Sequence, residues 1–259
     1  MLSLHTLLSP HILVMTRFHK KRPENNRTRL LKVQLTAYTK TPMAAPFRPL
    51  AEQAKSAFDR MSRQELDNHL AQRTYGDFTL PDGITPAPDF TPIAGYRHDT
   101  WQNEGYRVPC LIASVTRAKL FEVFLKLTDL LGSEVDVILE TSHGQRPNQG
   151  HKDMYREGID LPILQSTLWS YEDLLTHDGC TGIAVMNSSI PMEVQFDEHK
   201  LLMMYGAQLN TCKAVLRIHA IAQRKAMLLI TDGEHIHLTS DAFESRFRQL
   251  AIDLGVDQY

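Results

Sequence analysis

The fold is decided by residues 110–142, CLIASVTRAKLFEVFLKLTDLLGSEVDVILETS. The run at 110–115 is short and apolar, as expected for a strand that is buried on both faces. Residues 117–131 follow helical spacing, because their apolar side chains recur on one broad face. The stretch 135–142 is again apolar and β-branched, so it is the next strand. The three segments therefore predict a strand–helix–strand crossover unit.

The same periodicities continue downstream of this unit. They predict three more helices, at 161–176, 208–221 and 242–254. They also predict strands, at 182–187, 192–196, 200–205, 226–231 and 234–238. We therefore expect an α/β or α+β domain over 108–259, with a mixed β-sheet of about six strands covered by helices. Its buried side chains should include Leu120, Phe124, Leu168, Val185, Leu202, Leu216, Leu229 and Phe247.

The chain upstream of this domain divides into two parts. Residues 43–107 predict two helices within 48–72, the second opened by a Ser62–Glu65 capping box. A Pro-rich aromatic arm then covers about 76–107, where the prolines break regular elements. Residues 1–42 carry eight basic and one acidic side chain, against 20 basic and 29 acidic in the remainder. This basic segment predicts a disordered tail outside the fold, with a transit peptide as the alternative.

The block DLPILQSTLWSYEDLLTHDGCTGIAVMNSSIPMEVQFDEHKLLMMYG, residues 160–206, resembles a family of conserved bacterial proteins without assigned activity. The resemblance covers roughly residues 105–257. It implies a bacterial, cytoplasmic protein. It transfers no catalytic residue, because the family has none assigned.

Composition and known motifs exclude several classes of function. The acidic body gives no general attraction for nucleic acid or anionic lipid, and no stretch is long and apolar enough for a membrane helix. Phosphate-loop, dinucleotide, serine-hydrolase and zinc-protease motifs are all missing. The three cysteines, Cys110, Cys180 and Cys212, are scattered in or beside apolar runs, which predicts buried, reduced thiols rather than a disulfide framework.

Histidine is the residue type that suggests chemistry. His235 and His237 are two apart in a predicted strand, so both should project to one face and begin a metal site. His143 follows another strand and is the expected third ligand, with zinc as the expected metal. The weak candidates for acid–base catalysis are Glu140, His143, His151 and Glu234. Asp153 and the turn Asp197–Glu198–His199 could also contribute to such a site. The alternative to a site is that these histidines are solvent-exposed, on turns and on the exposed face of a strand, and have no functional role.

The acidic pairs Glu172–Asp173 and Asp197–Glu198 are expected to be solvated. Cys180 with His177 three residues earlier is a weak candidate nucleophile. Three hypotheses remain for the function. The sequence favours a non-catalytic interaction or regulatory module, with a protein partner or self-association through the aromatic arm at 86–106. The alternatives are a metal-dependent or acid–base enzyme of hydrolase type that uses the histidines, and a small-molecule-binding protein.

Overall fold

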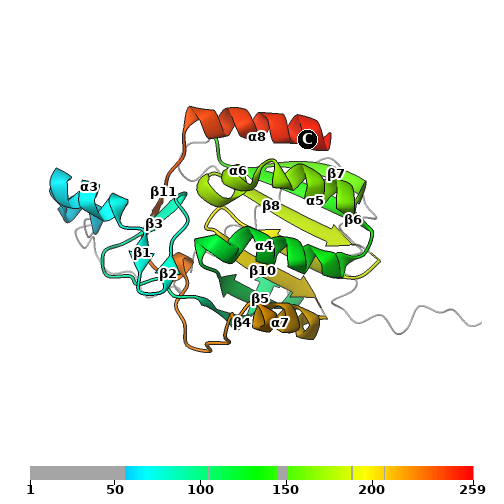
Figure 1. The fold of residues 1–259 in the computed structure, drawn as a ribbon, viewed down its shortest axis with the longest axis horizontal. Coiled ribbons are helices and arrows are strands. Elements are labelled where there is room, and N and C mark those ends of the chain that lie inside the picture. Colours follow the sequence, from blue (N-terminus) through cyan, green and yellow to red (C-terminus); the bar gives the residue numbers. More distant parts are fainter. Residues whose placement is uncertain (1–55, 104–105, 145–150, 188, 207, 259) are drawn as a thin grey trace, which may run out of the picture.

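The computed structural model describes residues 56–103, 106–144, 151–187, 189–206 and 208–258. Its centre is an eight-stranded sheet in the order β12-β7-β6-β8-β9-β10-β5-β4 (Figure 1). Every neighbouring pair in this sheet is antiparallel. The predicted class is therefore confirmed in its α+β form, but the sheet is antiparallel with eight strands, and not mixed with about six. The strands are β4 (Gly95–Asn103), β5 (Tyr106–Ser114), β6 (Glu134–Thr141), β7 (Lys152–Asp160), β8 (Thr181–Asn187), β9 (Met192–Phe196), β10 (Leu201–Gly206) and β12 (Asp257–Gln258).

The helices and two small sheets complete the described chain. The small sheets pair β1 (Thr74–Tyr75) with β2 (Phe78–Thr79), and β3 (Ile84–Pro86) with β11 (His235–His237). The helical elements are η1 (Phe58–Arg60), α3 (Arg63–Ala71), α4 (Arg117–Thr128), η2 (Asp129–Leu131), α5 (Leu161–Trp169), α6 (Glu172–His177), α7 (Leu209–Ile218), η3 (Ile230–Asp232) and α8 (Asp241–Leu254). The predicted Ser62–Glu65 capping box is present at the start of α3.

The crossover unit β5–α4–β6 forms as predicted, but its strands are not neighbours. Strands β8, β9 and β10 lie between β6 and β5 in the sheet. The four intervening pairings are all antiparallel, so β5 and β6 run in the same direction. Helix α4 thus crosses three strands before the chain re-enters the sheet. The predicted meander of three consecutive strands, β8–β9–β10, fills this gap.

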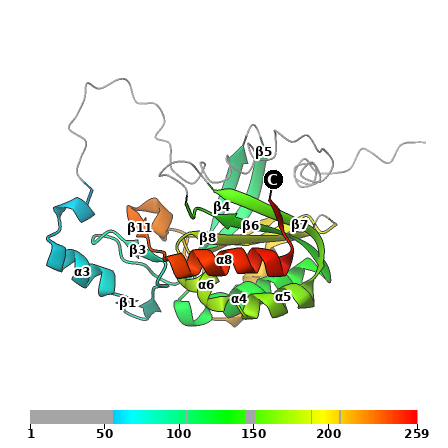
Figure 2. The same cartoon turned by 90° about the horizontal axis from the view of Figure 1, so that it is seen from above.

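One face of the sheet carries the main hydrophobic core. Helices α4, α5, α6 and α8 lie in a layer on this face (Figure 2), and α7 contributes Leu216 to the same core. Alternate residues of each strand point toward the helices, for example Val194 and Phe196 of β9. All eight side chains that were predicted to be buried are at most 3 % exposed.

The other face of the sheet has an apolar half and a polar half. Its β4–β5–β10 half is apolar and is covered by the segments around β2, β3 and η3, which contribute Phe78, Leu80, Ile84, Met227, Leu229 and Ile230. Its β9–β6–β7 half is polar. Glu193 and Gln195 of β9 and Glu140 of β6 are buried there, opposite to the core-facing residues of the same strands. The polar half leads to the end of the sheet where the histidines gather.

Three predicted boundaries are corrected by the structure. Residues 226–231 do not form a strand. Met227, Leu229 and Ile230 are buried because they cover the outer face of the sheet. Asp232 closes the turn that follows, because its carboxylate accepts from the Leu229 amide at 2.9 Å. The predicted helix 161–176 is two helices, since it breaks at Ser170. The last helix begins at Asp241 rather than at residue 242, and Ser240 caps it by accepting from the Phe243 amide.

The Pro-rich arm is largely part of the domain. Strand β4 lies within it and pairs with β5 along its whole length, so this part of the arm belongs to the central sheet. Tyr96 and Trp101 are each 7 % exposed and belong to the two cores. These two rings are therefore used inside the fold and are not free to anchor a partner.

No helix in the part of the chain described by the structure is long and apolar enough to cross a membrane. The expected disordered tail, residues 1–42, lies outside the described residues. So does the start of the first predicted helix at 48–55.

Candidate functional site

The candidate site lies at one end of the central sheet. Thr141 at the end of β6 is paired with Thr181 at the start of β8 and with Lys152 at the start of β7. The β9–β10 turn, residues 197–200, closes the adjacent strand pair at the same end. Strand β11 is fastened beside it, because the amide of Gly179 donates to Leu238 at 2.8 Å. Segments distant in sequence therefore meet at one place.

His199 is presented by the tight β9–β10 turn. Asp197 organises this turn: its backbone is bonded to Lys200 and Leu201, and its carboxylate accepts from the Leu201 amide at 2.8 Å. Lys200 has a φ of 61°, which is unusual for a residue with a side chain. Such left-handed residues are concentrated at turns and functional sites, where the surroundings hold them in place. The turn thereby fixes the direction of the His199 ring.

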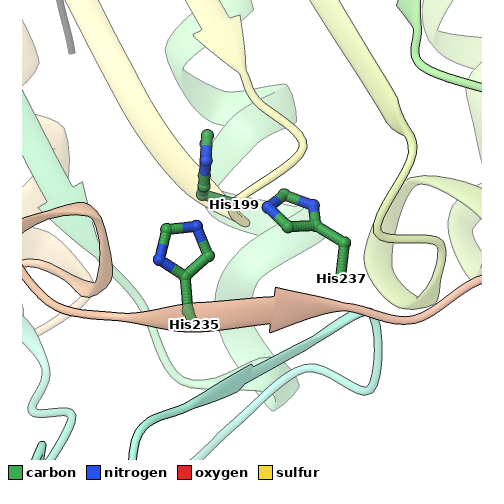
Figure 3. A group of neighbouring side chains, drawn as sticks. All are labelled: His199, His235 and His237. Atoms are coloured by element: carbon green, nitrogen blue, oxygen red, sulfur yellow. The ribbon is translucent and has the colours of Figure 1, made fainter. Parts of the chain in front are cut away.

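His235 and His237 come from β11, with Ile236 between them. Because strand side chains alternate, the two rings lie on the same side, with centroids 5.2 Å apart. The His199 ring lies 5.0 Å from that of His235 and 4.9 Å from that of His237. Figure 3 shows the three rings turned toward a common centre. One nitrogen from each ring lies within 4.8 Å of the others.

The second nitrogen of each ring is held by a neighbouring acceptor. Nδ1 of His199 bonds the Asp197 carboxylate at 2.8 Å, and Nδ1 of His235 bonds the Gly233 carbonyl at 3.0 Å. Nδ1 of His237 bonds the carbonyl of Gly179. A carbonyl cannot donate, so Nδ1 of His235 and His237 must carry the hydrogen, which leaves Nε2 with a free lone pair. Outer acceptors of this kind orient the imidazoles that bind metals.

The protonation of the three rings suits metal binding. Burial, and then the neighbouring His199, lower the pKa of His235. Burial lowers the pKa of His237 to about 4, so this ring is neutral near pH 7. Burial also disfavours charge on His199, but the Asp197 carboxylate outweighs it and raises the pKa of that ring. A metal ion would displace the His199 proton, because ligating imidazoles must be neutral.

The distances fit a zinc-class ion after a small adjustment. Tetrahedral zinc with Zn–N bonds of about 2.0–2.1 Å holds its nitrogens about 3.4 Å apart. The nitrogens here are separated by up to 4.8 Å, so binding would draw them together by side-chain rotation. Three protein ligands leave the fourth position open, which is the arrangement of catalytic rather than structural zinc.

A carboxylate stands beside the three histidines. Glu198 precedes His199, and its Oε2 accepts from the Ser142 hydroxyl at 2.9 Å and from Nε2 of His151 at 2.7 Å. Burial would raise the pKa of Glu198, yet the bond from His151 lowers it to about 2. Burial would lower the pKa of His151, but Glu198 raises it to about 9. The two side chains therefore form an ion pair over the physiological range.

A second group of possible metal ligands consists of His143, Asp178 and Cys180. The side chains of this group are already hydrogen-bonded to threonine hydroxyls. The Thr239 hydroxyl donates to Asp178, lies 3.0 Å from Nε2 of His143 and bonds the Cys180 thiol. His143 is also 3.2 Å from Asp178, and its Nδ1 is bonded to Thr141. Thr239 therefore sits among all three side chains that would have to meet at an ion. Burial raises the pKa of the Cys180 thiol, which disfavours a reactive thiolate.

The structure separates the residues that the sequence had grouped. His143 belongs to the Thr239 network, and His199 takes the third position beside His235 and His237. Glu234 is bonded to Ser56 and to the amide of Ala57, away from the three rings. Glu140 is 4 % exposed on the polar half of the sheet, where Gln195 donates to both of its oxygens at 3.0 and 3.2 Å.

The turn Asp197–Glu198–His199 was named only as a possible contributor to a site, and none of its residues was assigned as a ligand. The pair Asp197–Glu198 was expected to be solvated, but Asp197 is 4 % exposed and the Glu198 side chain 13 %. The only signal in the sequence is the run of four charged or titratable residues, DEHK, in a hairpin turn. The other pair, Glu172–Asp173, is exposed as predicted. The described cysteines are free thiols, as predicted, although Cys180 is only half-buried.

The chain was compared with protein-family models, curated proteins and solved structures, and none of them matches it. The resemblance of residues 160–206 to conserved bacterial proteins therefore stays an expectation.

Proposed function

We propose that this protein is a metal-dependent enzyme of hydrolase type. A single divalent ion of the zinc class is bound by His199, His235 and His237. One observation carries the proposal: three imidazoles converge, and the other nitrogen of each is fixed by an acceptor. A solvated group of histidines would have no need of three separate outer acceptors.

The expected chemistry follows from the donor set. Three neutral imidazoles leave the positive charge of the ion uncompensated, so a bound water becomes acidic, with a pKa near about 7. Held by the three histidines, the ion would supply a nucleophile from this water at neutral pH and would polarise a carbonyl or phosphoryl oxygen. Hydrolysis of an ester, amide or phosphoester is the reaction class that these properties support.

The competing functions have less support. Tyr96 and Trp101 of the aromatic arm are buried, which removes two of the anchors on which an interaction module would depend. A cavity of about 10 Å³ lies against His199 and Lys200, lined mostly by apolar side chains such as Leu80 and Ile230. That volume admits about one water, whereas ligand pockets measure roughly 300–1,000 Å³. The free thiols support a reducing, cytoplasmic setting.

The test is metal content, measured by elemental analysis of the purified full-length chain after dialysis. We expect about one equivalent of zinc-class metal in the natural protein. Replacement of His235 and His237 together by Ala should abolish it, and so should His199→Ala alone. His98→Ala is the matched control, because His98 is exposed on β4.

Thermal melting gives an independent reading of the same site. Added zinc should raise the melting temperature of the natural protein and of the His98 control, since a ligand that binds only the folded state stabilises it. The histidine variants should show no such rise. If the natural protein binds no zinc, cobalt, nickel, manganese or iron, the proposed centre is wrong.

A further inference from the structure

Glu198 is fixed beside the proposed metal centre by two donors that act on the same oxygen. Ser142 Oγ donates to Oε2 at 2.9 Å, and His151 Nε2 donates to Oε2 at 2.7 Å. The three side chains come from different places: the end of β6, the start of β7 and the β9–β10 turn. Such a convergence on one oxygen limits the rotation of the carboxylate more than a single ion pair would.

The two donors leave the other carboxylate oxygen uncommitted. Within the described residues, Oε1 of Glu198 accepts no hydrogen bond. Glu198 directly precedes His199 in the β9–β10 turn, and the charges of His237 and His199 act on its carboxylate. Among the described residues, the group of ligand atoms that lie within 4.8 Å of one another consists of His199, His235 and His237, without Glu198. Glu198 is thus placed next to the centre without being one of its ligands.

We propose that Glu198 is the residue that accepts a hydrogen bond from the water on the metal, and that His151 and Ser142 are its positioning residues. This inference rests on the proposed metal centre. A carboxylate that accepts from the bound water turns the lone pair of the water oxygen toward the substrate. The free oxygen, Oε1, is the acceptor, while Oε2 is the anchor.

The environment of His151 supports a positioning role. Its side chain is 8 % exposed, and among the described residues its Nδ1 has no hydrogen-bond partner. The ring is therefore oriented by its bond to Glu198 and by packing. Two acidic side chains act on it from neighbouring strands, Glu140 of β6 and Asp153 of β7. A carboxylate at Asp153 stabilises the imidazolium that donates to Glu198, whereas Glu140 does so only once it loses its proton, at about pH 8.

The experiment uses the full chain loaded with Co²⁺, whose visible absorption reports the state of the bound water. Three measurements are made: cobalt content, the pH midpoint of the absorption change, and hydrolysis of 4-nitrophenyl acetate. The variants are Glu198→Gln, His151→Leu and His151→Gln. The last keeps an N–H donor near the position of the imidazole Nε2. Glu122→Gln is the control, because Glu122 is exposed on α4.

We expect all variants to keep their cobalt. Glu198→Gln should raise the midpoint by about one pH unit and slow hydrolysis about 100-fold, within the usual range for a lost proton acceptor. His151→Leu should also raise the midpoint, and it should slow hydrolysis about tenfold. His151→Gln should restore most of the lost rate. Glu122→Gln should match the natural protein.

Two outcomes would overturn the inference while leaving the metal centre intact. In the first, Glu198→Gln binds cobalt with an unchanged midpoint. In the second, His151→Leu lowers the melting temperature but leaves the midpoint and rate as they were, which is the result for a purely structural ion pair. Failure of the natural protein to bind cobalt is a different result, because it overturns the metal centre and this inference with it.

Discussion

Glu140 gives a prediction that tests the polar half of the sheet without any knowledge of a substrate. Its carboxyl is 4 % exposed, and its oxygens accept only from the Gln195 amide among the described hydrogen bonds. Burial, and then the nearby charge of Asp153, raise the pKa of Glu140 to about 8 from an ordinary 4.5. The folded protein therefore keeps this proton through the range in which the unfolded chain releases it.

The sign and size of the effect follow from this difference. The folded state holds the Glu140 proton more tightly than the unfolded chain does. The contribution of Glu140 to the free energy of unfolding is therefore greatest below pH 4.5 and declines as the pH rises toward about 8. Each pH unit between these values corresponds to about 1.4 kcal/mol, which gives a decline on the order of 4–5 kcal/mol from this one group. Glu140→Gln removes the ionisation and preserves the shape, so this part of the decline should disappear.

The assay is urea unfolding, followed by tryptophan fluorescence at intervals between pH 4.5 and 8.5. We expect the free energy of unfolding of Glu140→Gln, relative to the natural protein, to increase steadily across this range. Glu193 also titrates in the natural protein, but it is present in both chains and largely cancels. The exposed Glu122→Gln serves as the control. Parallel curves for Glu140→Gln and the natural protein would refute the argument, since they would mean that Glu140 ionises normally in the fold.

Two further predictions concern the core and the N-terminal segment. Phe124→Ala should cost about 3–5 kcal/mol in urea unfolding, because Phe124 is fully buried against Phe196, whereas Ile218→Ala at an 80 % exposed position should be nearly neutral. A nearly neutral Phe124→Ala would show that this face of α4 is not core. Deletion of residues 1–42 should shift the melting temperature by only a few degrees, since this basic segment lacks a helical pattern; a large loss would show that it packs on the domain.

Much of the fold could be predicted because most of the central strands are short apolar runs and the helices have one apolar face. The meander β8–β9–β10 and helix α4 were found from apolar spacing alone, and all eight predicted core residues are buried. Strands β4 and β7 were missed because their sequences, GYRHDTWQN and KDMYREGID, are polar, as is usual for strands at or near the edge of a sheet. The break at Ser170 was missed because the residues on both sides remain in register with the same core.

The site was predictable only in part. The spacing of His235 and His237 places both rings on one face of a strand, and the structure has them there. Spacing carries no information about which distant residue completes the group. His143 was expected, but the Thr239 hydroxyl occupies the space among His143, Asp178 and Cys180. His199 was considered only as part of a turn that could contribute, because a charged hairpin turn normally faces water.

The arm that the sequence presents as an appendage is what brings the three histidines together. Residues of β3 pair with β11 in the register Ile84 to His237 and Pro86 to His235. The Gly83 carbonyl accepts from the Leu238 amide at 2.8 Å, on a strand that is itself bonded to Gly179. A side chain at Gly179 would come within 2.1 Å of the Gly83 carbonyl oxygen, so the three segments approach closely only because this position is glycine. Without the arm, β11 would lose its pairing strand and its histidines would no longer be held opposite His199. The Pro-rich segment is therefore part of the scaffold of the proposed metal centre, and its buried Ile84 and Thr85 serve the site as much as the fold.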